Sequence, residues 1–84
     1  MKLRVVAISD THEMHRQVVV PDGDVLVHAG DFTMSGTLPA IYEFNTWLGT
    51  LPHRHKVVVA GNHDWAFQRQ PAQARALLTN ATYL

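Results

Sequence analysis

The sequence predicts an α/β fold with a mainly parallel sheet, and three observations carry this prediction. Three short, β-branched apolar runs recur along the chain, and each ends in polar residues. The runs are nearly continuous rather than alternating, which is typical of parallel strands covered on both faces. A segment with helical spacing lies between the second and third runs. Because strands that alternate with helices favour βαβ crossovers, we expect one small α/β domain over residues 1–84.

The expected strands follow the apolar runs. They occupy residues 3–9, 24–29 and 56–60, and each is followed directly by Asp or by Gly and then a polar residue. A fourth strand is expected to open at residues 83–84. The carboxyl ends of parallel strands share one edge of a sheet, so the residues that follow these runs are expected to meet there.

Two helices are expected between the strands. The first covers residues 38–51, where leucine, isoleucine and phenylalanine recur at helical spacing, with Thr37 as its N-cap and Pro52 as its stop. The second covers residues 71–80, which are rich in alanine and leucine. The segment 10–24 shows no clear helix and contains a Pro-Asp-Gly turn signal.

The composition narrows the class of protein. The chain has 84 residues, with seven Lys and Arg, seven Asp and Glu, six His and no Cys. Without cysteine, disulfides and thiolate sites are excluded. The formal net charge is zero, so the sequence shows no basic patch of the kind that binds nucleic acid. No apolar run approaches the length of a membrane span or of a signal-peptide core, so we expect a cytoplasmic protein. The abundance of His, the commonest metal ligand, directs attention to metal chemistry.

The polar clusters at the expected strand ends contain metal-ligand residue types. They are Asp10 and His12 after the first strand, Asp31 after the second, and Asn62, His63 and Asp64 after the third. Asp and His suit Zn, Mn or Fe, and a carboxylate can bridge two cations. Gly30 and Gly61 would let the backbone turn sharply and approach a bound group. Two such metals could activate a water and clamp the oxygens of a displacement at phosphorus.

Each of these residues also has a simpler interpretation. Asp10 or Asp31 alone is typical of a cap or turn, and Asn62 alone of a left-handed turn. His28, inside a strand, is expected to be a hydrogen-bonded packing residue. Three other histidines in polar surroundings are expected to be solvated: His15, His53 and His55. The aromatic residues are expected in the core: Phe44, Trp47, Trp65 and Phe67.

Three motifs in this order resemble a known family. Asp10-Thr11-His12, Gly30-Asp31 and Gly61-Asn62-His63-Asp64 are similar to the D-x-H, G-D and G-N-H-[DE] blocks of calcineurin-like metallophosphoesterases. The resemblance covers nearly the whole chain and extends to the branch called metallophosphoesterase-domain-containing proteins. It implies a four-layer α/β/β/α sandwich of which residues 1–84 form the N-terminal βαβ half.

The resemblance also implies a role for each residue. Asp10 and His12 would bind the first of two divalent metals (Mn, Fe, Zn or similar), Asp31 would bridge both, and Asn62 would bind the second. His63 would contact the phosphate and assist the leaving group. Asp64 would orient the imidazole of His63, as a carboxylate beside a functional histidine commonly does.

The sequence departs from the family after Asp64. Family members supply further His ligands from a G-H and a G-H-x-H block, whereas no His follows Asp64 here. His15, His53 and His55 could substitute, but none follows a glycine. The second metal would then have only Asp31 and Asn62, so one metal or none is expected in this chain.

Three hypotheses follow for function. The first is a partial metal-dependent phosphoesterase acting on a phosphate mono- or diester, weakly active or inactive as this short chain. The second is a non-catalytic assembly or regulatory fragment whose uncovered sheet pairs with itself or with a C-terminal half. The third, a nucleotide-binding module, ranks lowest because no glycine-rich phosphate loop is present.

Overall fold

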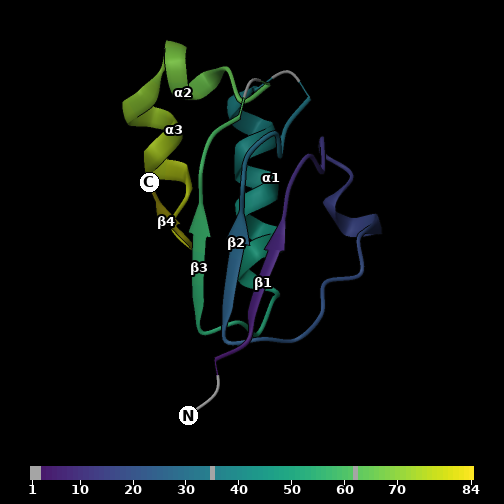
Figure 1. Cartoon of the computed structure of the whole chain (residues 1–84). Helices are drawn as coiled ribbons and strands as arrows, with labels where there is room; N and C mark the ends of the chain where they lie inside the picture. The colour runs from purple at the N-terminus through teal and green to yellow at the C-terminus, as the bar shows by residue number, and fades with distance from the viewer. Residues whose placement is uncertain (1–2, 35, 62) are drawn as a thin grey trace.

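Four parallel strands form a single sheet in the order β1-β2-β3-β4 (Figure 1). The computed structural model describes residues 3–34, 36–61 and 63–84. The strands are β1 (Val5–Ile8), β2 (Val25–His28), β3 (His55–Val58) and β4 (Thr82–Tyr83). Sequential strands are neighbours, and all their pairings are parallel, so each needs a crossover connection. The predicted α/β class is confirmed.

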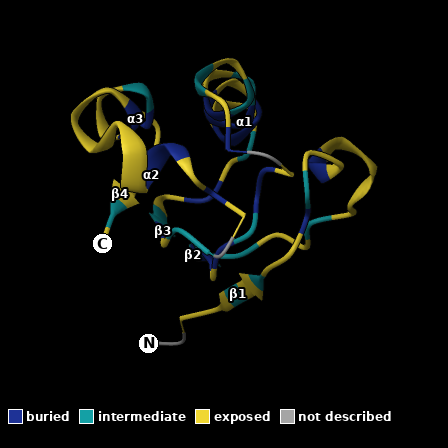
Figure 2. Ribbon diagram, turned by 90° about the horizontal axis from the view of Figure 1, so that it is seen from above, coloured by how far each residue is buried: buried dark blue, intermediate teal, exposed yellow. Residues whose placement is uncertain are grey.

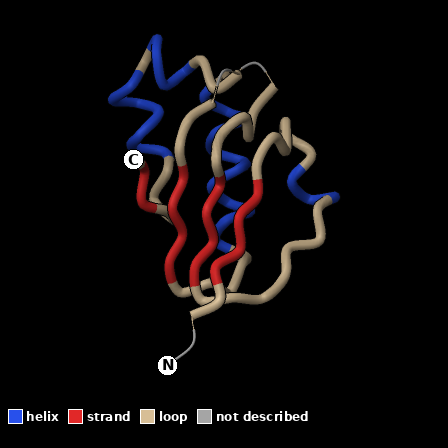
Figure 3. The backbone as a smooth tube through the Cα atoms, viewed as in Figure 1, coloured by secondary structure: helices blue, strands red, loops and turns tan. Residues whose placement is uncertain are grey.

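The connections place helices between the strands (Figure 3). A short 3-10 turn, η1 (His15–Gln17), lies between β1 and β2, and α1 (Leu38–Gly49) joins β2 to β3. Two short helices, α2 (Ala66–Arg69) and α3 (Pro71–Leu77), join β3 to β4. Helix α1 contacts both α3 and η1. The connections therefore form one helical layer over the sheet.

Helix α1 begins where the sequence predicts and supplies much of the core. Thr37 is its N-cap, and Thr37 Oγ1 accepts a hydrogen bond from Ala40 N at 3.3 Å. Its buried face includes Phe44, whose ring stacks on Phe32 from the loop after β2, with ring centroids 4.2 Å apart. Both aromatic rings are fully buried. The helix ends at Gly49, two residues before its predicted end.

One face of the sheet is covered and the other is exposed. Figure 2 shows α1, α2 and α3 on the same side of the strands. Leu26 and Val58 belong to the buried core on the side of the helices. Val5 and Val59 are 59% and 36% exposed. The uncovered sheet face expected for this chain is therefore present in the described residues, although the apolar runs are typical of strands covered on both faces. No helix in the described ranges is long and apolar enough to cross a membrane.

The second predicted helix is also different in the structure. Helix α3 ends at Leu77 rather than at residue 80. Helix α2, which lies directly before it, is not predicted by the sequence. Segment 10–24, which was expected to contain no helix, forms the single turn η1. These short elements contain too few residues for a helical period to be visible in the sequence.

Two of the histidines expected to be solvated are buried. His15 is 1% exposed, lies against Trp47 of α1, and hydrogen-bonds through Nε2 to Glu43. His53 is 4% exposed, and its Nε2 donates to the carbonyl oxygen of Pro21 at 2.9 Å. Both partners lie about thirty residues away in sequence, so neighbouring polar residues give no indication of this burial. His55 is exposed, as expected.

The predictions for the aromatic residues are correct with one exception. Phe44, Trp47 and Phe67 are buried in the core. Trp65 is 45% exposed instead, and the guanidinium of Arg69 lies over its ring at 5.0 Å. Trp65 directly precedes α2.

Candidate metal centre

The carboxyl ends of the first three strands lie level with one another. Ile8, His28 and Val58 are register partners across β1, β2 and β3. The loops that follow are joined by backbone hydrogen bonds, from Asp10 N to Gly30 O at 2.9 Å and from His12 N to Asp31 O at 3.0 Å. The predicted convergence of the strand ends is therefore present in the structure.

Three of the predicted metal ligands form one cluster. Asp10, His12 and Asp31 each offer a ligand atom, and these atoms lie within 4.8 Å of one another. The distance between His12 Nε2 and Asp10 Oδ1 is 3.8 Å. Asp10 is exposed, whereas His12 and Asp31 are half-buried, so the cluster is open to solvent on one side. Two carboxylates and one imidazole match the donor set of a first-row divalent metal, so the residues fit such an ion.

The backbone at this cluster adopts an uncommon conformation. Positive φ angles occur at Asp10 (56°), His12 (46°), Glu13 (64°) and Asp31 (58°). Asp and His tolerate this left-handed region better than most residues, although it still costs free energy. Strained backbone of this kind is concentrated at functional sites, where the surrounding structure holds it in place.

Two glycines allow the loops after β2 and β3 to touch. A Cβ on Gly30, which has φ of 114°, would lie 2.8 Å from Gly61 Cα. A Cβ on Gly61 would overlap the Oδ1 and N atoms of Asp31 and lie 2.7 Å from its Cγ. Real Cβ atoms do not approach backbone so closely. The expectation that both glycines serve close backbone approach is correct, and Gly61 makes room for Asp31 in particular.

His63 lies beside this cluster. Its ring is 5.1 Å from the His12 ring, centroid to centroid, in an edge-to-face arrangement. Its backbone N–H donates to Asp31 Oδ1 at 2.8 Å, which ties the loop after β3 to a predicted ligand. The imidazole is thus positioned at the rim of the cluster, as predicted. Asn62, the expected ligand of a second metal, lies outside the described residues.

Asp64 is buried beneath the cluster and is only 2% exposed. Its carboxylate accepts hydrogen bonds from the backbone N–H groups of Asp31, Thr33 and Gly61. These hydrogen bonds join the Asp64 carboxylate to the loops that follow β2 and β3. None of the hydrogen bonds described for it reaches the ring of His63. The orienting role expected for Asp64 has no counterpart among these contacts.

Two residues that the sequence analysis did not single out support the cluster from below. Thr11 is buried, and its Oγ1 is hydrogen-bonded to His28 Nε2 at 2.9 Å. His28 Nδ1 accepts from Gly30 N at 3.1 Å, so both ring nitrogens are paired, and the prediction of a packing histidine is correct. Burial lowers the pKa of His28 from 6.5 to about 4, although Asp64, Asp10 and Asp31 oppose this shift. Thr33 is the other supporting residue, because its hydroxyl donates to Asp64 Oδ1 at 2.6 Å.

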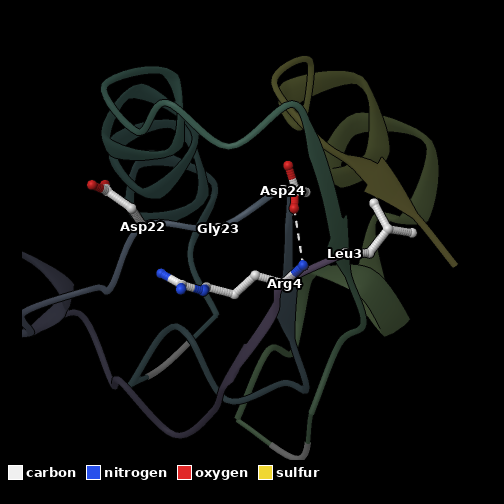
Figure 4. Close-up of a pocket in the computed structure, with 5 residues that line it drawn as sticks. All are labelled: Leu3, Arg4, Asp22, Gly23 and Asp24. Carbon is white, nitrogen blue, oxygen red and sulfur yellow. Dashed lines mark hydrogen bonds between the residues drawn. The ribbon is translucent and has the colours of Figure 1, made fainter. Parts of the chain in front are cut away.

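A separate hollow of about 560 Å³ lies at the amino ends of β1 and β2, away from the cluster (Figure 4). It is lined by Leu3, Arg4, Asp22, Gly23 and Asp24. Arg4 N donates to Asp24 Oδ2 at 2.9 Å, which extends the parallel pairing of the two strands. This contact explains the position of Asp24 without any ligand.

Comparisons with known proteins agree with this geometry. A family model described as calcineurin-like phosphoesterase matches residues 3–83. A UPF0046 protein of Caenorhabditis elegans is 45% identical over 100 aligned positions, which cover 99% of this chain and 36% of the relative. A second Caenorhabditis elegans UPF0046 protein is also 45% identical, and the match covers 33% of its length. Metallophosphoesterase domain-containing protein 1 of Homo sapiens is 48% identical over 67 residues, or 80% of this chain and 21% of the relative.

The chain thus spans about a third of the length of the Caenorhabditis elegans relatives that it matches. The family match extends over almost all of the 84 residues and includes the three strands and the loops that carry the cluster. The family is one of metal-dependent phosphoesterases, and its motifs coincide with the residues that converge here. The chain belongs to the calcineurin-like phosphoesterase family.

Proposed function

We propose that this chain is the N-terminal half of the metallophosphoesterase domain of a dinuclear metal-dependent enzyme that hydrolyses a phosphate mono- or diester. The observation that carries the proposal is the convergence of Asp10, His12 and Asp31, whose ligand atoms lie within 4.8 Å of one another. The family match and the shorter length of the chain relative to its relatives support it. A divalent metal in such a site activates a water and polarises the phosphoryl oxygens.

The chain's own residues would divide the work as follows. Asp10, His12 and Asp31 would hold the first metal, and Asp31 with Asn62 would contribute to a second. Without a cation the two carboxylates of the cluster repel each other, so they favour binding of a divalent ion. The exposed imidazole of His63 stands beside His12 and would hydrogen-bond the phosphate and pass a proton to the leaving oxygen.

The isolated chain is expected to bind one metal and to hydrolyse little. Asp10, His12 and Asp31 give the first metal three protein ligands, whereas the second receives only two from this chain. A two-ligand site is weak, because each missing ligand must be replaced by water. Metal binding is therefore a more sensitive test of the proposal than turnover.

The first prediction concerns Mn²⁺ affinity. Calorimetric titration of the chain with Mn²⁺ is expected to show binding of one ion, and Asp31→Ala is expected to weaken it by more than about tenfold because a central carboxylate is lost. Asp22→Ala is the matched control, since it removes the same charge from an exposed position in the hollow at the other end of the sheet. Equal weakening by both substitutions would indicate non-specific attraction and contradict the proposal.

Turnover of a nitrophenyl phosphodiester in Mn²⁺ tests the catalytic part separately. Any hydrolysis by the chain is expected to fall in Asp31→Ala and in His63→Ala. The second variant keeps all the proposed metal ligands, so its loss of hydrolysis would not come from loss of the metal. Unchanged turnover in both variants would contradict the assignment of these residues.

The exposed sheet face supports a second candidate function, that of an assembly fragment that pairs with another copy of the chain. Leu3 is 67% exposed and Val5 is 59% exposed, and β1 is an edge strand of the sheet. An exposed apolar face favours association with another apolar surface, and an unpaired edge strand can pair with a further strand. Sedimentation velocity is expected to show a dimer that dissociates when Val5→Lys places a charge on this face. A folded wild-type chain that sediments as a monomer at all concentrations would contradict pairing.

A further inference from the structure

The carboxylate of Asp64 joins the two loops that carry the candidate site. Oδ2 accepts from Asp31 N and Gly61 N, both at 2.8 Å, and more weakly from Phe32 N at 3.4 Å. Oδ1 accepts from Thr33 N at 2.9 Å and from Thr33 Oγ1 at 2.6 Å. All of these partners are donors, and hydrogen bonds to a buried carboxylate are among the stronger ones in proteins.

Asp31 is the residue that most needs this support. Its φ of 58° lies in the left-handed region, which is unfavourable for a residue with a Cβ. The direction of its side chain follows from that backbone conformation. Asp64 holds the N–H of Asp31 on one side, and the N–H of His63 holds Asp31 Oδ1 on the other. Asp31 is therefore held by one hydrogen bond at its backbone and by another at its carboxylate.

We propose that Asp64 is a positioning residue that acts through Asp31, and that it sets the metal affinity of the Asp10, His12 and Asp31 cluster. This inference rests on the proposed function, since it assigns to Asp64 a role in building the same metal site. The resemblance implies that Asp64 orients the His63 imidazole, whereas in this proposal Asp64 holds the backbone of the loop after β2, which carries Asp31. Residues that orient metal ligands commonly change metal affinity by about 10- to 100-fold when substituted.

The test compares Asp64→Asn with a matched structural control. The amide keeps the size of the carboxylate but replaces one of its two acceptor oxygens with an NH₂ donor, so the variant loses the hydrogen bonds on one side and the negative charge that strengthens the others. The control is Asn45→Ala, which removes another buried hydrogen-bonding side chain, one that joins α1 to Thr79 and Asn80 away from the cluster. Both variants are titrated with Mn²⁺ at a temperature where circular dichroism shows them folded.

Asp64→Asn is expected to weaken Mn²⁺ binding about 10- to 100-fold, and Asp64→Glu is expected to recover part of the affinity because it restores a carboxylate. Asn45→Ala is expected to lower stability without changing affinity. Wild-type affinity in folded Asp64→Asn would overturn the proposal, as would an equal loss in Asn45→Ala. The Co²⁺ absorption spectrum adds a signature of ligand geometry that a general loss of stability does not alter.

Two further measurements cover the remaining outcomes. If Asp64→Asn does not fold, Thr33→Val removes the hydroxyl that donates to Asp64 Oδ1 and, more weakly, to His63 O, and it leaves the Asp64 carboxylate in place. It is expected to weaken Mn²⁺ binding severalfold; unchanged affinity would then overturn the proposal. If the wild-type chain binds no Mn²⁺, the proposed function fails, and hydrogen exchange of the metal-free chain decides the role of Asp64. Loss of protection at the Asp31 amide in the Asp64 variants supports positioning, and retained protection overturns it.

Discussion

Gly61→Ala is expected to abolish Mn²⁺ binding and to destabilise the chain by about 1–3 kcal/mol or more, the range typical of overpacking in a closely packed site. The new Cβ would overlap Asp31 Oδ1 and the backbone N of Asp31. These atoms belong to a loop that is already held in a left-handed conformation and is joined to Asp64, so it cannot move aside without breaking those hydrogen bonds. Calorimetric titration with Mn²⁺ and urea denaturation measure the two effects.

Gly49→Ala provides the matched control for this substitution. Its Cβ would also meet a close neighbour, Asn80 Nδ2 at 2.7 Å, but that atom is the end of a flexible side chain rather than backbone. Gly49 is the last residue of α1, where alanine is favoured over glycine by up to about 1 kcal/mol. We expect this variant to bind Mn²⁺ normally. A Gly61→Ala protein that binds Mn²⁺ as tightly as Gly49→Ala would show that the two loops need not touch.

The sheet and the position of the candidate site could be predicted because their signals are local. A continuous β-branched run followed by a polar residue identifies both a strand and its carboxyl end, and parallel topology then brings Asp10 and Asp31 together without further information. Thr37 identifies its helix start in the same way, through a single capping hydrogen bond. In these cases, the physical cause of the structure lies within a few residues of its signal.

The errors arise where a residue's surroundings come from distant parts of the chain. His15 follows a polar stretch, yet Trp47 and Glu43 of α1 enclose it. Asp64 follows a histidine, which suggests an Asp-His pair, yet its partners are backbone amides of the loop after β2. Side-chain identity indicates that a group is polar, but the fold decides which partner satisfies it.

Acidification is expected to destabilise the chain through His28 by about 3 kcal/mol between pH 6.5 and pH 4. The ring is fully buried, and burial lowers its pKa from 6.5 to about 4. Between these values the unfolded chain binds a proton that the folded chain does not, so unfolding is favoured as the pH falls. Below about pH 4 both states bind the proton, and this contribution to stability is fully lost. Urea denaturation in EDTA, at several pH values from 7 to 4, measures the effect.

His28→Asn isolates this contribution from the titration of the carboxylates. Asn Oδ1 can take the place of Nδ1 as the acceptor for Gly30 N, so the variant keeps one of the two hydrogen bonds of His28 and does not titrate in this range. It is expected to be less stable than wild type at pH 7, because the aromatic contacts with Phe32 and Phe44 are lost. The difference in stability should shrink towards pH 4, where the wild-type ring becomes charged and Nδ1 can no longer accept from Gly30. A difference that stays constant with pH would mean that His28 takes up its proton equally in the folded and unfolded chain, and that its burial does not exclude the charged form.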